Sequence, residues 1–111
     1  MSYDRFMYGT PPTAEDLVAE IRRITQGVVG IAVMPAPFAS DVWIVALPFH
    51  VQKIPGEGPR TADIEVWLDD DSIDVLTRGQ PWVVGTVADA LAARLAERFN
   101  MKMEGDDADP R

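Results

Sequence analysis

Four aspartates in the second half of the chain are the first candidates for metal chemistry. Asp69, Asp70 and Asp71 are consecutive, and Asp74 follows three positions later. Carboxylate oxygens are the ligands that Mg²⁺ and Ca²⁺ prefer, but they must converge on one point. Adjacent side chains on a strand point in opposite directions, and the residue pattern of a calcium-binding loop is absent. The run therefore predicts a solvated acidic turn, and we expect neither a metal ion nor another cofactor.

The sequence offers little for acid–base or nucleophilic catalysis. Glu65 and Asp74 are near enough in the sequence to be neighbours in a hairpin, but a glycosidase-like pair needs a cleft between its carboxyl groups. A chain of 111 residues has little room for such a cleft. His50 is the single histidine, there is no cysteine, and no serine lies in a Gly-x-Ser-x-Gly motif. We therefore expect a protein that is not an enzyme; a small enzyme or ligand-binding domain that uses His50 and nearby carboxylates is an alternative.

Trp67 lies among the carboxylates and indicates binding rather than catalysis. On an alternating strand its side chain shares a face with Glu65. A tryptophan within a polar rim is typical of a protein–protein hot spot, whereas the other interpretation is that a segment of this chain covers the ring. The predicted partner-binding residues are Glu65, Trp67, Asp69, Asp70, Asp71 and Asp74.

The net charge of −8 comes almost entirely from one part of the chain. Residues 1–60 contain six acids and five bases, whereas residues 61–111 contain twelve acids and five bases. Such a field repels nucleic acid and anionic membranes, because binding to them requires clustered Lys and Arg. It attracts a basic protein surface; alternatively, the acids serve solubility alone. We expect a basic protein as partner, with no nucleic acid and no membrane.

The segment from Ala62 to Arg78 predicts the hairpin that positions these residues. On each side of the aspartates, apolar and polar residues alternate as in a strand with one buried face. We place Asp70 and Asp71 at the centre of the turn between these two strands. One face of this hairpin is apolar: Leu68 is opposite Ile73, Val66 opposite Val75 and Ile64 opposite Thr77. The other face is mixed: Trp67 is opposite Asp74, Glu65 opposite Leu76 and Asp63 opposite Arg78.

Two helices are predicted to pack against the sheet. Thr13, followed by an acid three residues later, opens the first helix, and Gly27 ends it. Thr86 repeats this start for the second helix, and Asn100 is suited to end it in the left-handed conformation. In both helices apolar residues recur at helical spacing, so each presents one apolar face.

Four further strands are predicted outside the hairpin, over residues 2–8, 28–34, 41–49 and 101–104. The run 41–49 is apolar on both alternating faces, which is typical of a strand that is covered on both sides. We expect it to be central in the sheet, with Trp43 in the core. The glycine- and proline-rich residues 50–61 are predicted to be a surface loop.

Together these elements predict an α+β domain. We expect a two-layer sandwich, with a mainly antiparallel sheet of five or six strands and two helices on one face, ferredoxin-like with an inserted hairpin. Residues 1–104 are expected to form this single domain, and residues 105–111 an acidic flexible tail. No stretch is suited to a membrane helix, and a chain without cysteine is compatible with a reducing compartment, so we expect a cytoplasmic protein.

The function predicted from the sequence is that of a non-enzymatic acidic protein-binding domain. An inhibitor or immunity-type protein, of the kind with which bacteria neutralise a basic partner, is one form of this function. The main alternative is a structural or assembly module, in which edge strands and Trp67 are buried against a second copy in a homodimer.

Overall fold

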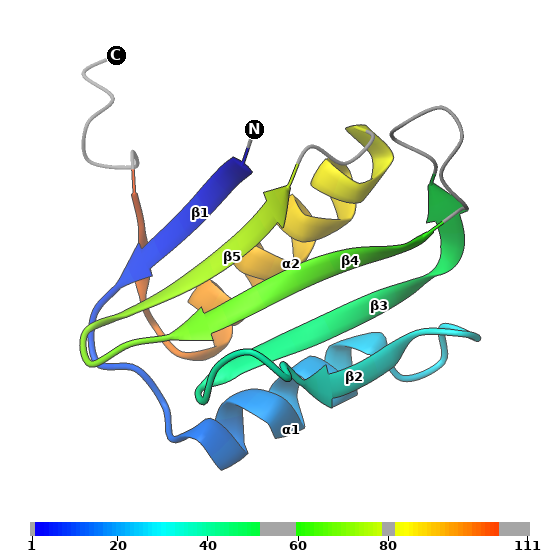
Figure 1. The fold of residues 1–111 in the computed structure, drawn as a ribbon. Helices are drawn as coiled ribbons and strands as arrows, with labels where there is room; N and C mark the ends of the chain where they lie inside the picture. Colours follow the sequence, from blue (N-terminus) through cyan, green and yellow to red (C-terminus); the bar gives the residue numbers. More distant parts are fainter. Residues whose placement is uncertain (1, 52–59, 79–81, 105–111) are drawn as a thin grey trace.

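The computed structural model describes residues 2–51, 60–78 and 82–104 of the chain (Figure 1). Along the sequence the elements are β1 (Ser2–Tyr8), α1 (Ala14–Thr25), β2 (Ala32–Pro35), β3 (Val42–Val51), β4 (Arg60–Leu68), β5 (Ser72–Arg78), α2 (Trp82–Arg98) and β6 (Lys102–Met103). The predicted tail at 105–111 lies outside the described residues. So does most of the predicted loop at 50–61, although its two ends belong to β3 and β4.

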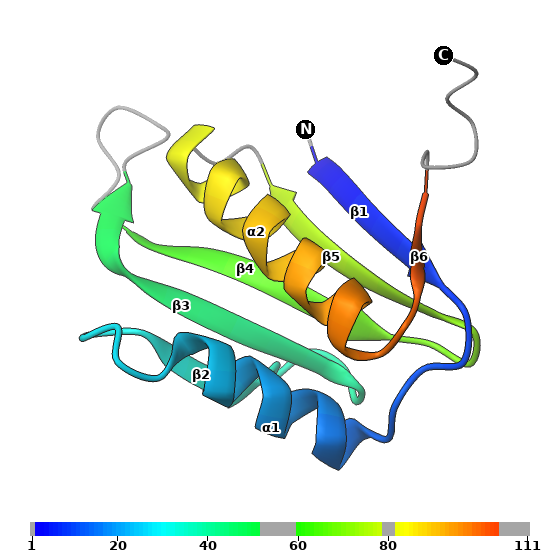
Figure 2. The ribbon, with the colours of Figure 1, turned by 180° about the vertical axis from the view of Figure 1, so that it is seen from behind.

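The strands form one sheet in the order β2-β3-β4-β5-β1-β6, and every neighbouring pair is antiparallel. Both helices lie on the same face of this sheet (Figures 1 and 2). The α+β class, the six-stranded antiparallel sheet and the one-sided helix layer are therefore confirmed. The ferredoxin-like description remains a prediction. We call the face opposite the helices the open face.

The hairpin of β4 and β5 adopts the predicted register. Glu65 is opposite Leu76, Val66 opposite Val75, Trp67 opposite Asp74 and Leu68 opposite Ile73. The backbone N–H of Asp69 donates to the carbonyl oxygen of Ser72 at 2.9 Å, which closes the turn around Asp70 and Asp71. Local alternation was enough to predict this pairing because a slip of one residue would reverse both faces.

The predicted ends of the helices are largely confirmed. The side chain of Thr13 accepts a hydrogen bond from the backbone N–H of Asp16 at 3.2 Å, as an N-cap residue does. After α1, Gly27 has a φ of 87°. After α2, Asn100 has a φ of 54°, a left-handed conformation that asparagine tolerates better than most residues.

The predicted start of the second helix at Thr86 is wrong, because α2 begins at Trp82. Two valines and Gly85 precede Thr86, and these residue types favour helix less than alanine or leucine does. Tertiary contacts outweigh that preference. Val84 is fully buried in the core, and the carbonyl oxygen of Gly85 accepts a hydrogen bond from the side chain of Arg5 at 3.3 Å.

The predicted strand at 28–34 also begins too early, because β2 spans only Ala32–Pro35. Gly30 interrupts the apolar run with a φ of 91°. A Cβ at this position would lie only 2.6 Å from Cβ of Pro48, so the close approach requires glycine. Val29 is consequently 92% exposed rather than part of a strand.

The core lies between the sheet and the helices. On the helix side of the sheet, Val45 is opposite Ile64 and Trp43 opposite Val66, and Trp43 packs against this core while remaining partly exposed. The prediction that β3 is covered on both sides is wrong for most of its open-face residues, because no helix lies on that face (Figure 1) and only Val42 among them is buried. These residues are Val42, Ile44 and Ala46. Ile44 and Ala46 are half-buried and leave a short apolar strip on a face that the sequence predicted to be covered.

Candidate functional site

The open face gathers the predicted partner-binding residues with others from β1. Residues that are directly opposite in antiparallel strands share a face. Phe6 is opposite Asp74, and Asp4 is opposite Leu76, so β1 extends the mixed face of the hairpin. The described side chains of this face include those of Asp4, Phe6, Tyr8, Asp63, Glu65, Trp67, Asp74, Leu76 and Arg78.

Trp67 lies against the open face rather than projecting from it. Its ring is tilted over that of Phe38, with the ring centroids 5.9 Å apart, and its indole N–H donates to Glu65 Oε1 at 3.0 Å. Phe38 belongs to the connection between β2 and β3 and is 57% exposed. Trp67 itself is half-buried. The two rings therefore form an aromatic pair that this chain covers only in part.

Glu65 is held in place by two partners. Besides the indole of Trp67, it binds Arg78, whose Nε donates to Glu65 Oε2 at 2.6 Å and whose Nη2 donates to Oε1 at 3.3 Å. This diagonal ion pair was not predicted. Asp63, on the same face of β4, has a pKa above its ordinary value because burial and then the charge of Glu65 disfavour its ionised form.

Asp74 is the most perturbed acid of the open face. Only 9% of the residue is exposed, and Oδ1 accepts a hydrogen bond from the backbone N–H of Arg5 at 3.2 Å. Burial, and then the charge of the nearby Asp4, raise the pKa of Asp74 to about 7. Because Asp4 is opposite Leu76 and Phe6 is opposite Asp74, the two carboxylates are diagonal neighbours across β1 and β5. Asp74 is therefore poised to lose its proton near neutral pH.

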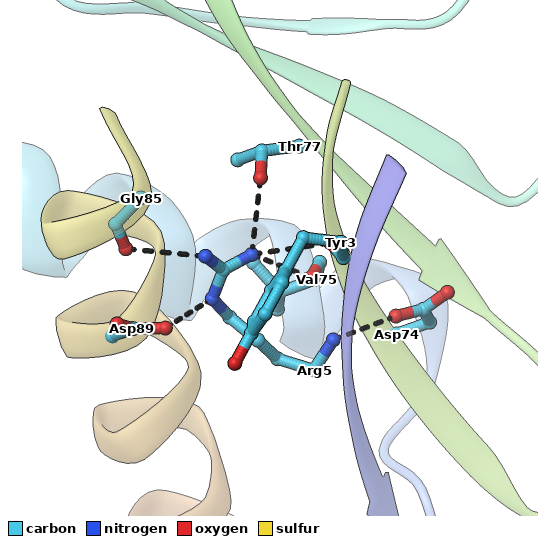
Figure 3. Close-up of polar contacts among 7 residues, drawn as sticks. All are labelled: Tyr3, Arg5, Asp74, Val75, Thr77, Gly85 and Asp89. Atoms are coloured by element: carbon cyan, nitrogen blue, oxygen red, sulfur yellow. Dashed lines mark hydrogen bonds and ion pairs between the residues drawn. The ribbon is translucent and has the colours of Figure 1, made fainter. Parts of the chain in front are cut away.

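Arg5 connects this carboxylate pair with the helix layer (Figure 3). Its backbone N–H donates a hydrogen bond to Asp74 on the open face, while its buried side chain points to α2. There the guanidinium binds the carboxylate of Asp89 and donates to the carbonyl oxygen of Gly85 at 3.3 Å and to the hydroxyl of Thr77 at 3.3 Å. One residue thus fixes β1 against both β5 and α2, which holds the carboxylate pair in place.

The three turn acids lie at one end of the open face. Asp69, Asp70 and Asp71 are all exposed, and the carbonyl oxygen of Asp71 accepts a hydrogen bond from the backbone N–H of Gly9 at 3.2 Å. Tyr8 lies close to this turn. Its pKa is raised by burial and then by the charges of Glu104, Asp71 and Asp74. The turn therefore extends the acidic surface as far as β1.

Sequence reasoning missed the residues of β1 and of the β2–β3 connection. Phe6 and Tyr8 stack with their ring centroids 6.0 Å apart, and Phe38 covers part of Trp67. Asp4 raises the pKa of Asp74 from 70 positions away. The alternation of β1 alone could have placed Asp4, Phe6 and Tyr8 on one face. Only the strand order brings that face next to β5.

The described residues can also be compared with the requirements of a metal site and of a membrane span. Among the described residues, no group of three or more His, Cys, Asp and Glu side chains is arranged to hold a metal ion. His50 belongs to β3, but the position of its side chain lies outside the described part of the molecule. Neither α1 nor α2 combines the length and the apolar character that a membrane span requires.

Comparisons of this chain with protein-family models, with curated proteins and with solved structures gave no match.

Proposed function

We propose that this protein is a non-enzymatic binding domain whose open face recognises a basic surface on a protein partner. The observation that carries this proposal is the combination found on one uncovered face. Partly covered aromatic rings lie beside carboxylates, among them the buried Asp74, which is opposite Phe6 and Trp67. The nearby cation on this face, Arg78, is paired with Glu65. Aromatic anchors surrounded by polar groups are typical of protein interfaces.

The exposed Asp4, beside the buried Asp74, is the best-suited contact for a cation. A Lys or Arg side chain placed beside them would favour their ionised forms and relieve their mutual repulsion. Trp67 and Phe38 lie on the same face and would supply the apolar part of the contact. A partner that presents a cation near an apolar patch would therefore match both features of the face.

The charge of the face supports a different protein as partner rather than a second copy. A symmetric dimer places the same surface patch of each chain against the other. On this face that arrangement would bring acids such as Asp4, Asp63 and Asp74 towards the same acids of the second copy. The homodimer remains the alternative function, and a solution mass of twice the chain mass would support it.

The role that we propose for this recognition is inhibition, in the manner of an immunity-type protein that covers the basic surface of its target. Electrostatic complementarity of this kind accelerates association and makes affinity depend on salt. We expect the affinity for such a partner to fall steeply as ionic strength rises. Binding that does not change with salt would contradict the proposal.

A pair of matched variants tests whether the open face is the binding surface. Asp4→Asn with Asp63→Asn removes two carboxylates from the open face, and Glu15→Gln with Glu97→Gln removes two from the helices. Both variants lose two formal negative charges, and at pH 8, where Asp74 is largely ionised in both, long-range attraction is nearly equal. We expect only the first to weaken binding to a partner captured from the native host, by about tenfold. Equal effects of the two variants would contradict this assignment.

A further inference from the structure

A second feature of the molecule is a pocket on the helix side of the sheet, between α1 and α2. It has a volume of about 130 Å³. Val45, Leu47 and Ile64 form its floor, and the two helices form its walls. Figure 2 shows β3 and β4 between the diverging helices. An apolar cavity of roughly 150 Å³ accommodates benzene in another protein, so this pocket has room for a group of about that size.

The walls of the pocket are almost entirely apolar. Ile24 and Val28 line it on the side of α1, and Val87 and Leu91 line it on the side of α2. Val28 is 51% exposed, so a ligand seated here would bury apolar surface that now faces water. Thr25 also lines the pocket, but its hydroxyl already donates to the carbonyl oxygen of Ile21 at 2.8 Å. The interior therefore favours an apolar group.

Arg94 is the single charged residue among the described residues that line this pocket. Within the described part of the chain its side chain has no hydrogen bond or ion pair. Two nearby arginines differ in this respect. Arg23 and Arg98 both bind the buried Glu20, with Nε at 3.0 Å and 3.4 Å from Oε1 respectively. Arg94 lines both this pocket and a neighbouring polar hollow that it shares with Arg23, Glu97 and Arg98. Arg94 therefore lies at the border between the apolar pocket and a cationic surface, where its unpaired guanidinium is available to an anion.

We propose that this pocket binds a small amphipathic carboxylate, with an aromatic ring or a short branched alkyl group in the cavity and the carboxylate on Arg94. The apolar lining selects the tail, and the unpaired guanidinium selects the charge. The pocket lies on the opposite side of the sheet from the open face. This site is therefore independent of the proposed protein-binding function, and either can fail without the other.

The probe for this site is phenylacetate, and its uncharged control is phenylacetamide. We expect titration with phenylacetate to shift the backbone NMR signals of Val28, Ile64 and Leu91, with a dissociation constant on the order of 1 mM. The amide fits the same cavity but lacks the charge, so it should bind about fivefold more weakly. Absence of these shifts at phenylacetate concentrations well above the expected dissociation constant would overturn the proposal. Equal binding of the two compounds would overturn it as well.

Two pairs of substitutions test the charge and the cavity separately. Arg94→Gln should weaken phenylacetate binding about fivefold and leave phenylacetamide binding unchanged, whereas Arg22→Gln on the exposed side of α1 should change neither. Ala90→Leu fills the pocket from α2 and should weaken the binding of both compounds at least tenfold. Ala93→Leu, on the same helix but outside the pocket lining, should leave the binding of both unchanged. Equal binding by Arg94→Gln and native protein, or by the two alanine variants, would overturn the proposal.

Discussion

Asp74→Asn should make the protein more stable at alkaline pH and less sensitive to pH. The substitution keeps the shape of the side chain and its Oδ1, which accepts the backbone N–H of Arg5. It removes a carboxylate whose pKa burial and Asp4 raise to about 7. Because this carboxyl binds its proton more tightly in the folded than in the unfolded state, native stability falls as pH rises between the two pKa values.

The size of this effect follows from the two pKa values of Asp74. An unfolded value of 3.8 and a folded value of about 7 correspond to a cost of about 4 kcal/mol well above pH 7. The cost is absent below the unfolded pKa and fully present above the folded one. Between pH 5 and pH 8 it should therefore grow by roughly 2 to 3 kcal/mol. Asparagine has no such titration.

Urea unfolding of the native protein and the variant at pH 5 and pH 8 measures this effect. We expect Asp74→Asn to gain stability over the native protein by about 2 kcal/mol or more on going from pH 5 to pH 8. Asp70→Asn, in the exposed turn, is the control and should stay within about 0.5 kcal/mol of the native protein at both values. Equal pH dependence of Asp74→Asn and native protein would refute the reasoning.

Two further substitutions test the contacts that hold the fold. Arg5→Met removes the donors to Asp89, Thr77 and Gly85, and urea unfolding should show a loss of about 3 kcal/mol, against less than about 0.5 kcal/mol for Arg22→Met. A loss below about 1 kcal/mol would contradict the role of Arg5. Thr13→Ala removes the acceptor at the start of α1 and should cost about 1 kcal/mol; an unchanged melting temperature would contradict the cap.

The features that sequence reasoning predicted are local ones. The pairing of Trp67 with Asp74 follows from alternation on either side of a turn, and the start of α1 follows from the hydroxyl of Thr13. Both depend on residues that are close together in the chain. The class of the fold followed from the sequence of such elements, because amphipathic helices and strands have few ways to bury their apolar sides.

The features that it missed depend on contacts between distant segments. Asp4 affects Asp74 only because β1 joins the sheet beside β5, which no local pattern indicates. Residues 41–49 resembled a strand covered on both sides, and only the positions of both helices show that no helix covers Ile44 and Ala46. The first turn of α2 forms against local propensity, because Val84 is buried and Gly85 binds Arg5.

The affinity of Trp67→Ala for the captured partner tests most directly whether the open face is a binding surface. Val83→Ala, which shortens an exposed apolar side chain on α2, is the matched control. We expect Trp67→Ala to weaken binding by about thirtyfold or more, corresponding to roughly 2 kcal/mol, while both variants remain folded at the assay temperature. Binding by folded Trp67→Ala as tight as that of Val83→Ala would contradict the account.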